Sequence, residues 1–394
     1  MPGAQNATYP AVKTVSPSYG NGVHDATAHI QSIIDAANTE DVEVYVPAGT
    51  YKITATLEGL QRMRLAEGAK ITAGAAMTAV IRTSIGTRLD RGYIGGKGVI
   101  DANTNAEIGL HIRDFLYFEA RGLSVTGGKL AAIKLGDAGS SGRSAEAVIS
   151  GVRLFSNAPT VIAGGCGILV ENSGDHSFSQ IIIQNYETGV TLPVGGNAVV
   201  HDVHAWADPA KGAMKVGFED HSNGSHYNSC HADSPTQYGW HIYGYNVTLV
   251  QCGTYLNPGV TQIADNTVVG IRFESAYSVA VIVGHFFNGA SESLRMNSDI
   301  QAVDAIYGSV TYIGCTQSNV VHMLTNRNRL VDIVMDANVG AQIGTNPAQK
   351  LGFYGATPTV RPALTYSRAT ENAAQAQIRT TLVGLGLVTD STVA

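Results

Sequence analysis

One short phrase occurs three times in succession between Gly196 and Asn257. Its copies follow glycine-containing turns and alternate small or apolar with polar residues: Ala198–Trp206, Ser225–Asp233 and Asn246–Tyr255. Cys230 and Cys252 hold the same place in the phrase, with Val203 one copy earlier and Cys315 two copies later. A fixed place in a repeat of roughly twenty to thirty residues is typical of a solenoid. The sequence therefore predicts one stack of short strands, which grows in one dimension.

The composition agrees with a mainly β protein. The 394 residues include 45 Gly and only 14% charged residues, which suits short strands and tight turns better than long helices. The chain has 25 basic and 31 acidic residues, a net charge of −6, and no Lys/Arg cluster. We therefore expect no nucleic-acid partner, and mild repulsion of a strongly anionic ligand.

The cysteines and the first residues also limit the function. Four cysteines in a chain of this length do not make a disulfide framework, so we expect four thiols, no metal cluster and no cofactor. Residues 1–10 have neither a basic nor an apolar segment of a signal peptide, and no stretch approaches 18 apolar residues. These features predict a soluble protein without membrane insertion.

The N-terminal part predicts a cap for the stack. Residues 26–37 carry Ile30, Ile33, Ile34 and Ala37 on one helical face, and residues 42–46 and 50–53 read as strands. A helix across the first turn would cover an otherwise unpaired end of the stack. We therefore predict an N-terminal segment with a capping helix at 1–40, stacked strands at 41–345 and a C-terminal segment at 346–394.

Apolar residues in successive segments predict the register of the stack. We expect these side chains to follow one another in the interior: Leu123, Val152, Ile183, Val203, Cys230, Cys252, Val283 and Cys315. Their uneven steps are expected because strands stack at a constant ~4.8 Å while the connecting loops differ in length. The variable loops are places where function can be grafted.

The entry segment carries a resemblance to a known family. Residues Gly20–Thr27, Ile33–Ala37 and Val44–Tyr51 together resemble the entry segment of the pectate-lyase-like right-handed parallel β-helix family, which is common among bacteriophage tailspikes and minor tail proteins. The resemblance implies an all-β, right-handed, single-stranded parallel β-helix with an N-terminal helix cap. It does not specify a reaction.

The ending changes character. Residues 370–383 predict a helix with a narrow apolar stripe of Ala374, Ile378, Leu382 and Leu385, which is marginal alone and needs a partner. Lys350–Pro358, with a following Arg-Pro and Leu382–Leu387, resembles the C-terminal signature of tailed-phage tail and appendage proteins. The resemblance implies an oligomerisation segment, a parallel homotrimer, other virion tail proteins as partners and a location in the virion tail.

The densest polar and aromatic patch lies between His176 and His241, which holds seven of the 12 histidines and both tryptophans. Aromatic faces pack on pyranose rings, and carboxylates and imidazoles bind hydroxyls. We therefore predict a polysaccharide groove with these ligand-binding residues: His204, Trp206, Tyr227, Trp240 and Tyr243. The alternative is that His and Asn decorate an exposed face while the aromatics cover the hydrophobic wall.

Catalysis would need two carboxyl groups, about 5–5.5 Å apart for retention or about 6.5–9.5 Å apart for inversion. Asp202, Asp220 and Asp233 are the candidates for acid and base. A lyase reaction is disfavoured because Lys211 and Lys215 are the only Lys/Arg residues between 196 and 257. We predict no metal site, because the odd separations of the histidines here point them to opposite strand faces.

The sequence and these resemblances thus favour a phage tail protein that recognises a host cell-surface polysaccharide. Whether it also degrades this polysaccharide, as a glycoside hydrolase-type depolymerase, stays open at this point. The alternative is a non-catalytic structural or adhesive tail component. A further alternative is a cellular polysaccharide lyase.

Overall fold

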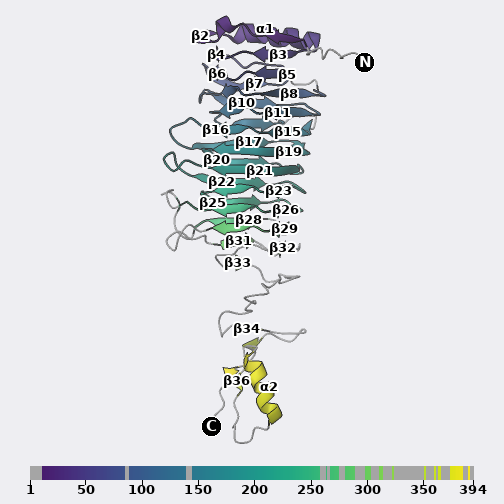
Figure 1. Cartoon of the computed structure of the whole chain (residues 1–394), viewed down its shortest axis with the longest axis vertical. Helices are drawn as coiled ribbons and strands as arrows, with labels where there is room; N and C mark the ends of the chain where they lie inside the picture. Colours follow the sequence, from purple (N-terminus) through teal and green to yellow (C-terminus); the bar gives the residue numbers. More distant parts are fainter. Residues whose placement is uncertain are drawn as a thin grey trace, which may run out of the picture. The chain divides into compact units, whose positions relative to one another are not determined.

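The computed structural model of the chain describes residues 11–84, 88–138, 144–257, 263, 267–274, 280–288, 298–302, 310–313, 322–323, 350–351, 359–360, 363–364, 373–384 and 389–390. The chain divides into two units, Met1–Asp332 and Ile333–Ala394. The first unit is the predicted right-handed parallel β-helix, in which each coil adds one strand to each of three rows (Figure 1).

Row 1 and row 2 belong to one large sheet, and row 3 is a second sheet. Row 1 contains β1 (Val12–Thr14), β3 (Glu43–Val46), β5 (Arg62–Leu65), β8 (Gly92–Gly96), β11 (Phe118–Arg121), β15 (Ala147–Ser150), the first halves of β19 (His176–Gln184) and β21 (Ala198–Trp206), β23 (His226–Asn228), β26 (Val247–Val250), β29 (Ala280–Val283) and β32 (Val310–Ile313).

Row 2 follows row 1 in each coil. It contains β2 (Asn21–Asp25), β4 (Gly49–Ile53), β6 (Ala69–Ala73), β9 (Val99–Asp101), β12 (Ser124–Thr126), β16 (Arg153–Phe155), the second halves of β19 and β21, β24 (His231–Asp233), β27 (Gly253–Tyr255) and β30 (Phe286–Asn288).

Row 3 completes the coil. It contains β7 (Met77–Arg82), β10 (Ala106–Ile112), β13 (Ala131–Leu135), β17 (Ile162–Val170), β20 (Tyr186–Leu192), β22 (Met214–Asp220), β25 (Pro235–Ile242), β28 (Val269–Phe273), β31 (Ser298–Ala302) and β33 (His322–Met323). A two-residue pair, β14 (Ser144–Ala145) with β18 (Ser173–Gly174), lies outside the three rows.

One residue in left-handed conformation makes the corner between rows 1 and 2 in many coils. Gln180, Asp202, Ser229 and Gln251 occupy this corner with φ between 51° and 54°, and Gly151 takes the same place in an earlier coil with φ 61°. Polar or glycine residues tolerate this conformation at low cost, and the turn directs the chain onto the next row. The corner therefore fixes where row 2 begins.

The inner faces of rows 2 and 3 approach closely, and glycine makes the approach possible. A Cβ added at Gly217 would lie 2.4 Å from Cβ of Ala232, and one at Gly239 would lie 2.2 Å from Oγ1 of Thr254. The residue after each glycine, for example the fully buried Trp240, also faces the interior, so the alternation of inner and outer side chains is interrupted at this place.

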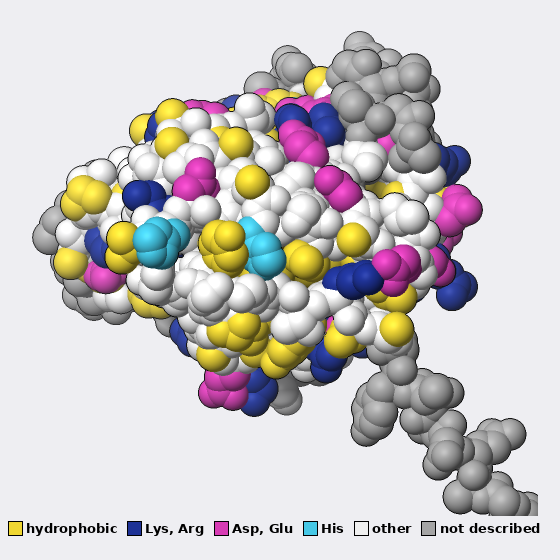
Figure 2. Space-filling model, turned by 90° about the horizontal axis from the view of Figure 1, so that it is seen from above, with side chains coloured by type: hydrophobic (Ala, Val, Ile, Leu, Met, Phe, Trp, Pro, Cys, Tyr) yellow, Lys and Arg dark blue, Asp and Glu magenta, His cyan; other side chains and the backbone are white. Residues whose placement is uncertain are grey.

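The predicted cap is confirmed. Helix α1 (Thr27–Glu40) follows the 3-10 turn η1 (Pro17–Tyr19), and buries Ile30, Ile34 and Ala37 on the first coil. The carboxylate of Asp25 accepts a hydrogen bond from the backbone N–H of Thr27 at 2.9 Å, which satisfies a free donor of the first turn. Figure 2 looks down on this end, where histidine and hydrophobic side chains lie between groups of charged ones.

The predicted interior register is correct in five places and wrong in two. The pairing of Ser124 with Arg153, of His204 with His231 and of His231 with Gly253 confirms the stacking of Leu123 on Val152 and of Val203, Cys230 and Cys252. Ile181, not Ile183, pairs with Val203, and Gly253 pairs with Phe286, which places His285, not Val283, after Cys252. Both errors are slips of two residues. Ile183 is itself buried and inward-facing, whereas Val283 is partly exposed and lies before the corner residue Gly284, so the buried His285 takes the interior place after Cys252. Cys315 lies outside the described residues.

Three cysteines among the described residues, Cys166, Cys230 and Cys252, are free thiols. Cys230 and Cys252 are fully buried, as predicted for an interior position that takes small apolar groups. Burial raises the pKa of the Cys230 thiol, which keeps it neutral. No helix in the described part of the chain has both the length and the apolar character needed to cross a bilayer.

The second unit contains helix α2 (Ala373–Gly384), close to the predicted helix, with two small sheets: β34 (Lys350–Leu351) pairs with β35 (Thr359–Val360), and β36 (Ala363–Leu364) with β37 (Thr389–Asp390). Ile378, from the predicted apolar stripe, is 60% exposed. The predicted boundary between 345 and 346 lies outside the described residues.

Candidate functional site

Four of the predicted site residues lie together on the outer face of row 2 and at its corner. Trp206 pairs with Asp233 across β21 and β24, and Nε2 of His204 lies 3.8 Å from Oδ2 of Asp233. The His204 ring stacks on Trp206 with centroids 6.3 Å apart. Asp202 occupies the exposed corner before them. Burial lowers the pKa of His231, and the negative charges of Asp202 and Asp233 oppose this shift without reversing it.

Three other predicted residues lie inside the coil. Asp220, Tyr227 and Trp240 are at most 1% exposed. The hydroxyl of Tyr227 donates to Oδ2 of Asp220 at 2.8 Å, and burial raises the pKa of this carboxyl. Trp240 stacks on Phe218 with centroids 4.7 Å apart. Because the core encloses these side chains, a surface ligand does not reach them, and the candidate site excludes Asp220, Tyr227 and Trp240.

Tyr243, the remaining predicted residue, directly follows the row 3 strand β25. Eight successive row 3 strands carry a line of matched outer positions, one from each strand: Arg82, His111, Lys134, Leu169, Thr191, Glu219, His241 and Arg272. Seven strand spacings make this line roughly 34 Å long. Charged and imidazole side chains occupy both ends, and Leu169 and Thr191 occupy the middle.

The sequence contains a signal for this line that the opening analysis did not use. Six row 3 strands, β10, β17, β20, β22, β25 and β28, repeat a glycine, then an apolar residue and then the outer residue, as in Gly109-Leu110-His111, Gly217-Phe218-Glu219, Gly239-Trp240-His241 and Gly270-Ile271-Arg272. In β13 an alanine takes the place of the glycine, and in β7 it is Val80. The glycine is needed where a neighbouring row approaches closely, and the apolar residue fills the core. The third place is left for a polar side chain on the surface.

At one end of the line, Glu219, His221, His241, Tyr243 and Glu274 form what we call the β22–β28 cluster, together with Tyr238 and Arg272. His241 lies 2.8 Å from Oε1 of Glu274, and His221 lies 3.1 Å from Oε1 of Glu219. Tyr243 stacks on His221 with centroids 4.1 Å apart and planes 7° apart. The cluster therefore combines carboxylates, imidazoles and an aromatic face.

The carboxyl groups of the β22–β28 cluster stay ionised. The hydrogen bond from His221 lowers the pKa of Glu219, against the effect of burial. Burial raises the pKa of Glu274, but hydrogen bonds from His241 and Arg272 outweigh it, and the net shift is downward. Ionised carboxylates accept hydrogen bonds, whereas a general acid needs a raised pKa.

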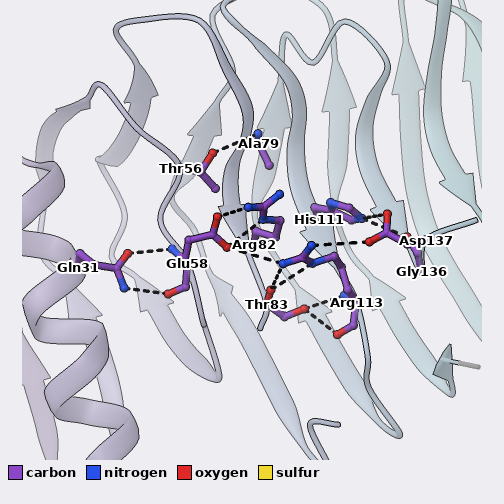
Figure 3. A network of polar contacts seen from close by, with 10 residues as sticks. All are labelled: Gln31, Thr56, Glu58, Ala79, Arg82, Thr83, His111, Arg113, Gly136 and Asp137. Atoms are coloured by element: carbon purple, nitrogen blue, oxygen red, sulfur yellow. Dashed lines mark hydrogen bonds and ion pairs between the residues drawn. The ribbon is translucent and has the colours of Figure 1, made fainter. Parts of the chain in front are cut away.

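At the other end of the line, Glu58, Arg82, Arg113, His111 and Asp137 form what we call the β7–β13 network, shown with its neighbours in Figure 3. Two nitrogens of Arg82 contact the carboxylate of Glu58, with Nε 2.9 Å from Oε2, and Arg113 lies between Glu58 at 3.8 Å and Asp137 at 3.7 Å. His111 lies 3.2 Å from Asp137 and 3.0 Å from the carbonyl of Gly136.

The β7–β13 network ties the cap to the coils. The Gln31 side chain of α1 exchanges two hydrogen bonds with the backbone of Glu58, at 2.8 and 2.9 Å. Lys134 extends the network by ion pairs to Asp137 at 3.4 Å and Glu171 at 2.8 Å. Each charged side chain in this network is paired with one of opposite charge. We therefore interpret the network as a structural clamp between the cap and the first coils.

The two ends of row 3 thus differ in what they offer a ligand. Within the described residues, no group of three or more His, Cys, Asp or Glu side chains is arranged to hold a metal ion. The β22–β28 cluster offers hydrogen-bond donors and acceptors beside an aromatic ring 37% exposed, which is the chemistry of sugar binding.

The parallel strands of successive coils, stacked in three rows, place this chain in the class of parallel β-helix proteins. A sequence model of the family described as rhamnogalacturonase A/epimerase, pectate lyase-like, matches residues 16–278. This chain belongs to that family. The resemblance seen in the entry segment is therefore confirmed. No curated protein sequence matches the chain significantly.

Solved structures share the fold at low sequence identity. The Dettilon tailspike protein is similar with a TM-score of 0.54 and 12% identity, over 79% of this chain and 68% of that chain. PfbA, a surface adhesin of Streptococcus pneumoniae, has a TM-score of 0.50 and 15% identity over 80% of this chain and 81% of its own. The endo-xylogalacturonan hydrolase of Aspergillus tubingensis has a TM-score of 0.50 and 13% identity over 80% and 93%. These similarities concern the fold.

Proposed function

We propose that this chain is a phage tail protein, of the tailspike or minor tail type, that binds a host cell-surface polysaccharide along row 3, with the β22–β28 cluster as its main contact. The observation that carries the proposal is the arrangement of Glu219, His221, His241 and Tyr243 on adjacent coils, in which His241 is mostly buried and the other three are partly exposed. A polysaccharide lying along the stack would meet successive coils at ~4.8 Å, a repeat comparable to that of its own sugar units.

The tail context is supported by the fold shared with a tailspike and by the C-terminal resemblance. We propose a parallel homotrimer held in part by residues 346–394, with other virion tail proteins as further partners and the virion tail as location. The 60% exposure of Ile378 on α2 supports a partner for this helix. Light scattering of the whole chain and of a chain cut before Lys350 tests the role of the segment. Trimers in both would contradict it.

Binding is tested by titrating host-envelope polysaccharides into the whole chain and into His241→Ala. This variant removes the contact with Glu274 and the ring packed on Tyr243 at 4.4 Å. We expect affinity to fall roughly tenfold, as for loss of about one or two good polar contacts. The matched control is His204→Ala, an imidazole on row 2 that is similarly paired with a carboxylate. Loss of affinity in His204→Ala alone would show that the polysaccharide binds on row 2 and not on row 3.

A second candidate function is hydrolysis of the bound polysaccharide. Glu219 and Glu274 lie on either side of His241 in alternate coils, so two carboxyl groups face the same stretch of row 3. Asp202 and Asp233 remain the alternative pair on row 2. The lowered pKa values of Glu219 and Glu274 favour binding over acid catalysis.

Incubation with host polysaccharide, followed by reducing-end and unsaturated-uronate assays, distinguishes the classes. New reducing ends without unsaturated product would establish a hydrolase, and their loss in Glu219→Gln or Asp233→Asn would identify the row. Unsaturated product would indicate a lyase. Binding without either product would support the adhesive, non-catalytic tail component.

A further inference from the structure

A hollow lies on row 1, on the outer faces of β5, β8 and β11. Its volume is about 840 Å³, and its lining includes Arg62, Asp90, Arg91, Tyr93, Leu116, Tyr117, Glu119 and Glu146. Arg62, Tyr93 and Glu119 are paired in register on adjacent strands, so the floor is built on the regular part of the sheet. The remaining lining residues come from the turns that enter row 1.

The Tyr93 side chain lies flat on the outer surface of its own strand and covers Gly95, two residues further along. The space that a Cβ of Gly95 would occupy is filled by the end of the tyrosine ring, since the added atom would lie 2.1 Å from its hydroxyl oxygen and 2.5 Å from Cζ. Gly95 is buried beneath the ring, and Tyr93 remains partly exposed. A ring held along a sheet surface in this way presents a platform on which a flat apolar group can stack.

The groups around this platform can form hydrogen bonds with the hydroxyl groups of a sugar. Arg91 forms no ion pair with any described residue, so its guanidinium is available as a donor. The hydroxyl of Tyr117 lies 3.3 Å from Oε2 of Glu119, and burial raises the pKa of Tyr93 and of Tyr117, which keeps both phenols protonated. Donors and acceptors therefore alternate around an aromatic surface, as sugar rings require.

The charge of the lining selects among sugars. Three carboxylates, Asp90, Glu119 and Glu146, and two guanidinium groups, Arg62 and Arg91, line the hollow. Arg62 is paired with Asp41 and Glu119 with Arg121, both partners lying outside the hollow, which leaves Asp90 and Glu146 against Arg91. An anionic sugar would meet net negative charge here, whereas a neutral one would not.

We propose that this hollow is a binding site for a neutral saccharide, with one pyranose ring stacked on Tyr93. It lies on row 1, whereas the glycan proposed above lies on row 3, and the two sites are independent. A polymer or a branched glycan could therefore be held at two faces of one coil stack, which would raise its avidity.

The test uses the whole chain on a printed array of neutral and acidic glycans, followed by calorimetric titration of the glycans retained. Gly95→Ala is the main variant, because the new methyl group displaces the Tyr93 ring without removing any lining side chain. Gly95 does not have a positive φ, so its backbone accepts alanine. Tyr93→Leu is the second variant. Tyr45→Leu is the control, an aromatic residue on row 1 under Arg64 and outside the hollow.

We expect at least one neutral glycan whose affinity falls roughly tenfold in Gly95→Ala and in Tyr93→Leu and stays unchanged in Tyr45→Leu. Retention of acidic glycans only, retention of none, or equal affinity in all four proteins would overturn the proposal. If the affinity for every retained glycan falls in His241→Ala and is unchanged in Tyr93→Leu, the row 3 proposal is supported and the row 1 site is contradicted.

Discussion

The two ends of row 3 use the same kinds of residues for different purposes. In the β7–β13 network the Arg113 side chain is 8% exposed and its charge is balanced by Glu58 and Asp137. In the β22–β28 cluster Glu219 and His221 are 28% and 29% exposed, and a tyrosine ring covers the imidazole. The comparison concerns polar residues at equivalent outer positions of row 3. Where their charges are neutralised by ion pairs with one another, they act as a structural clamp. Where hydrogen-bond donors, acceptors and an aromatic face remain partly exposed, they can form a binding site.

Removal of Arg113 is expected to have the largest effect on stability. Arg113→Met keeps most of the volume but leaves Glu58 and Asp137 with less compensation and the carbonyl of Thr83 without its donor at 3.2 Å. We expect the free energy of unfolding to fall by about 2–4 kcal/mol. Urea unfolding measures it. A loss below about 0.5 kcal/mol would show that the network is not a clamp.

The pH dependence of stability gives the next largest effect. Burial lowers the pKa of His111 to about 4; the charges of Lys134 and Arg113 add to this shift, and the hydrogen bond to the carbonyl of Gly136 and the charge of Asp137 oppose it. The unfolded chain binds this proton near pH 6.5, so the stability present above that value is lost as pH falls to about 4. We expect a loss of roughly 2–3 kcal/mol over this interval in the native chain.

His111→Gln should flatten that loss, because glutamine does not titrate. The buried His285, whose pKa burial lowers to about 3, remains in both proteins and contributes the same slope to each. Unfolding curves at a series of pH values between 7 and 4 compare the two. Parallel curves would mean that His111 does not carry the pH dependence.

A substitution in the β22–β28 cluster should have the reverse pattern. Tyr243→Ala removes a ring 37% exposed, so we expect little change in stability and a loss of about 1 kcal/mol in polysaccharide affinity. Urea unfolding and titration of the same preparation check both. Unchanged affinity together with reduced stability would make Tyr243 a structural residue.

The smallest effect is expected on row 2. Trp206→Ala removes a half-buried indole beside His204, and we expect polysaccharide affinity to change by less than about 0.5 kcal/mol. A larger loss would place the glycan on row 2, near Asp202 and Asp233.

The sequence predicted the fold from local features. The cap came from one amphipathic helix, and the stack came from the repeated phrase, because constant strand spacing imposes a pattern on the chain. The register slipped by two residues at Ile183, since inward positions recur every second residue and the pattern alone does not choose between them. It slipped at Val283 because the corner residue Gly284 follows, so the inward place beyond the corner belongs to His285. Neighbouring pairs across strands resolve this choice.

The candidate site was harder to predict for a physical reason. Composition placed Tyr227 and Trp240 on the surface, but Tyr227 holds a regular inward place in β23 between two exposed residues. In β25 the successive residues Gly239 and Trp240 are both buried, which breaks the period of two. The β22–β28 cluster joins residues from three coils, so its members are 53 positions apart along the chain at Glu219 and Arg272. Their shared place after a glycine was the readable signal, whereas their ion pairs depend on side-chain geometry that sequence does not give.

The most direct test measures polysaccharide affinity of His241→Ala and Arg113→Met side by side, at a temperature where both are folded. The account predicts that folded His241→Ala binds roughly tenfold more weakly, and that Arg113→Met is destabilised yet binds as the unaltered chain does. Equal affinity loss in both variants, or loss in Arg113→Met alone, would contradict the division of row 3 into a clamp and a site.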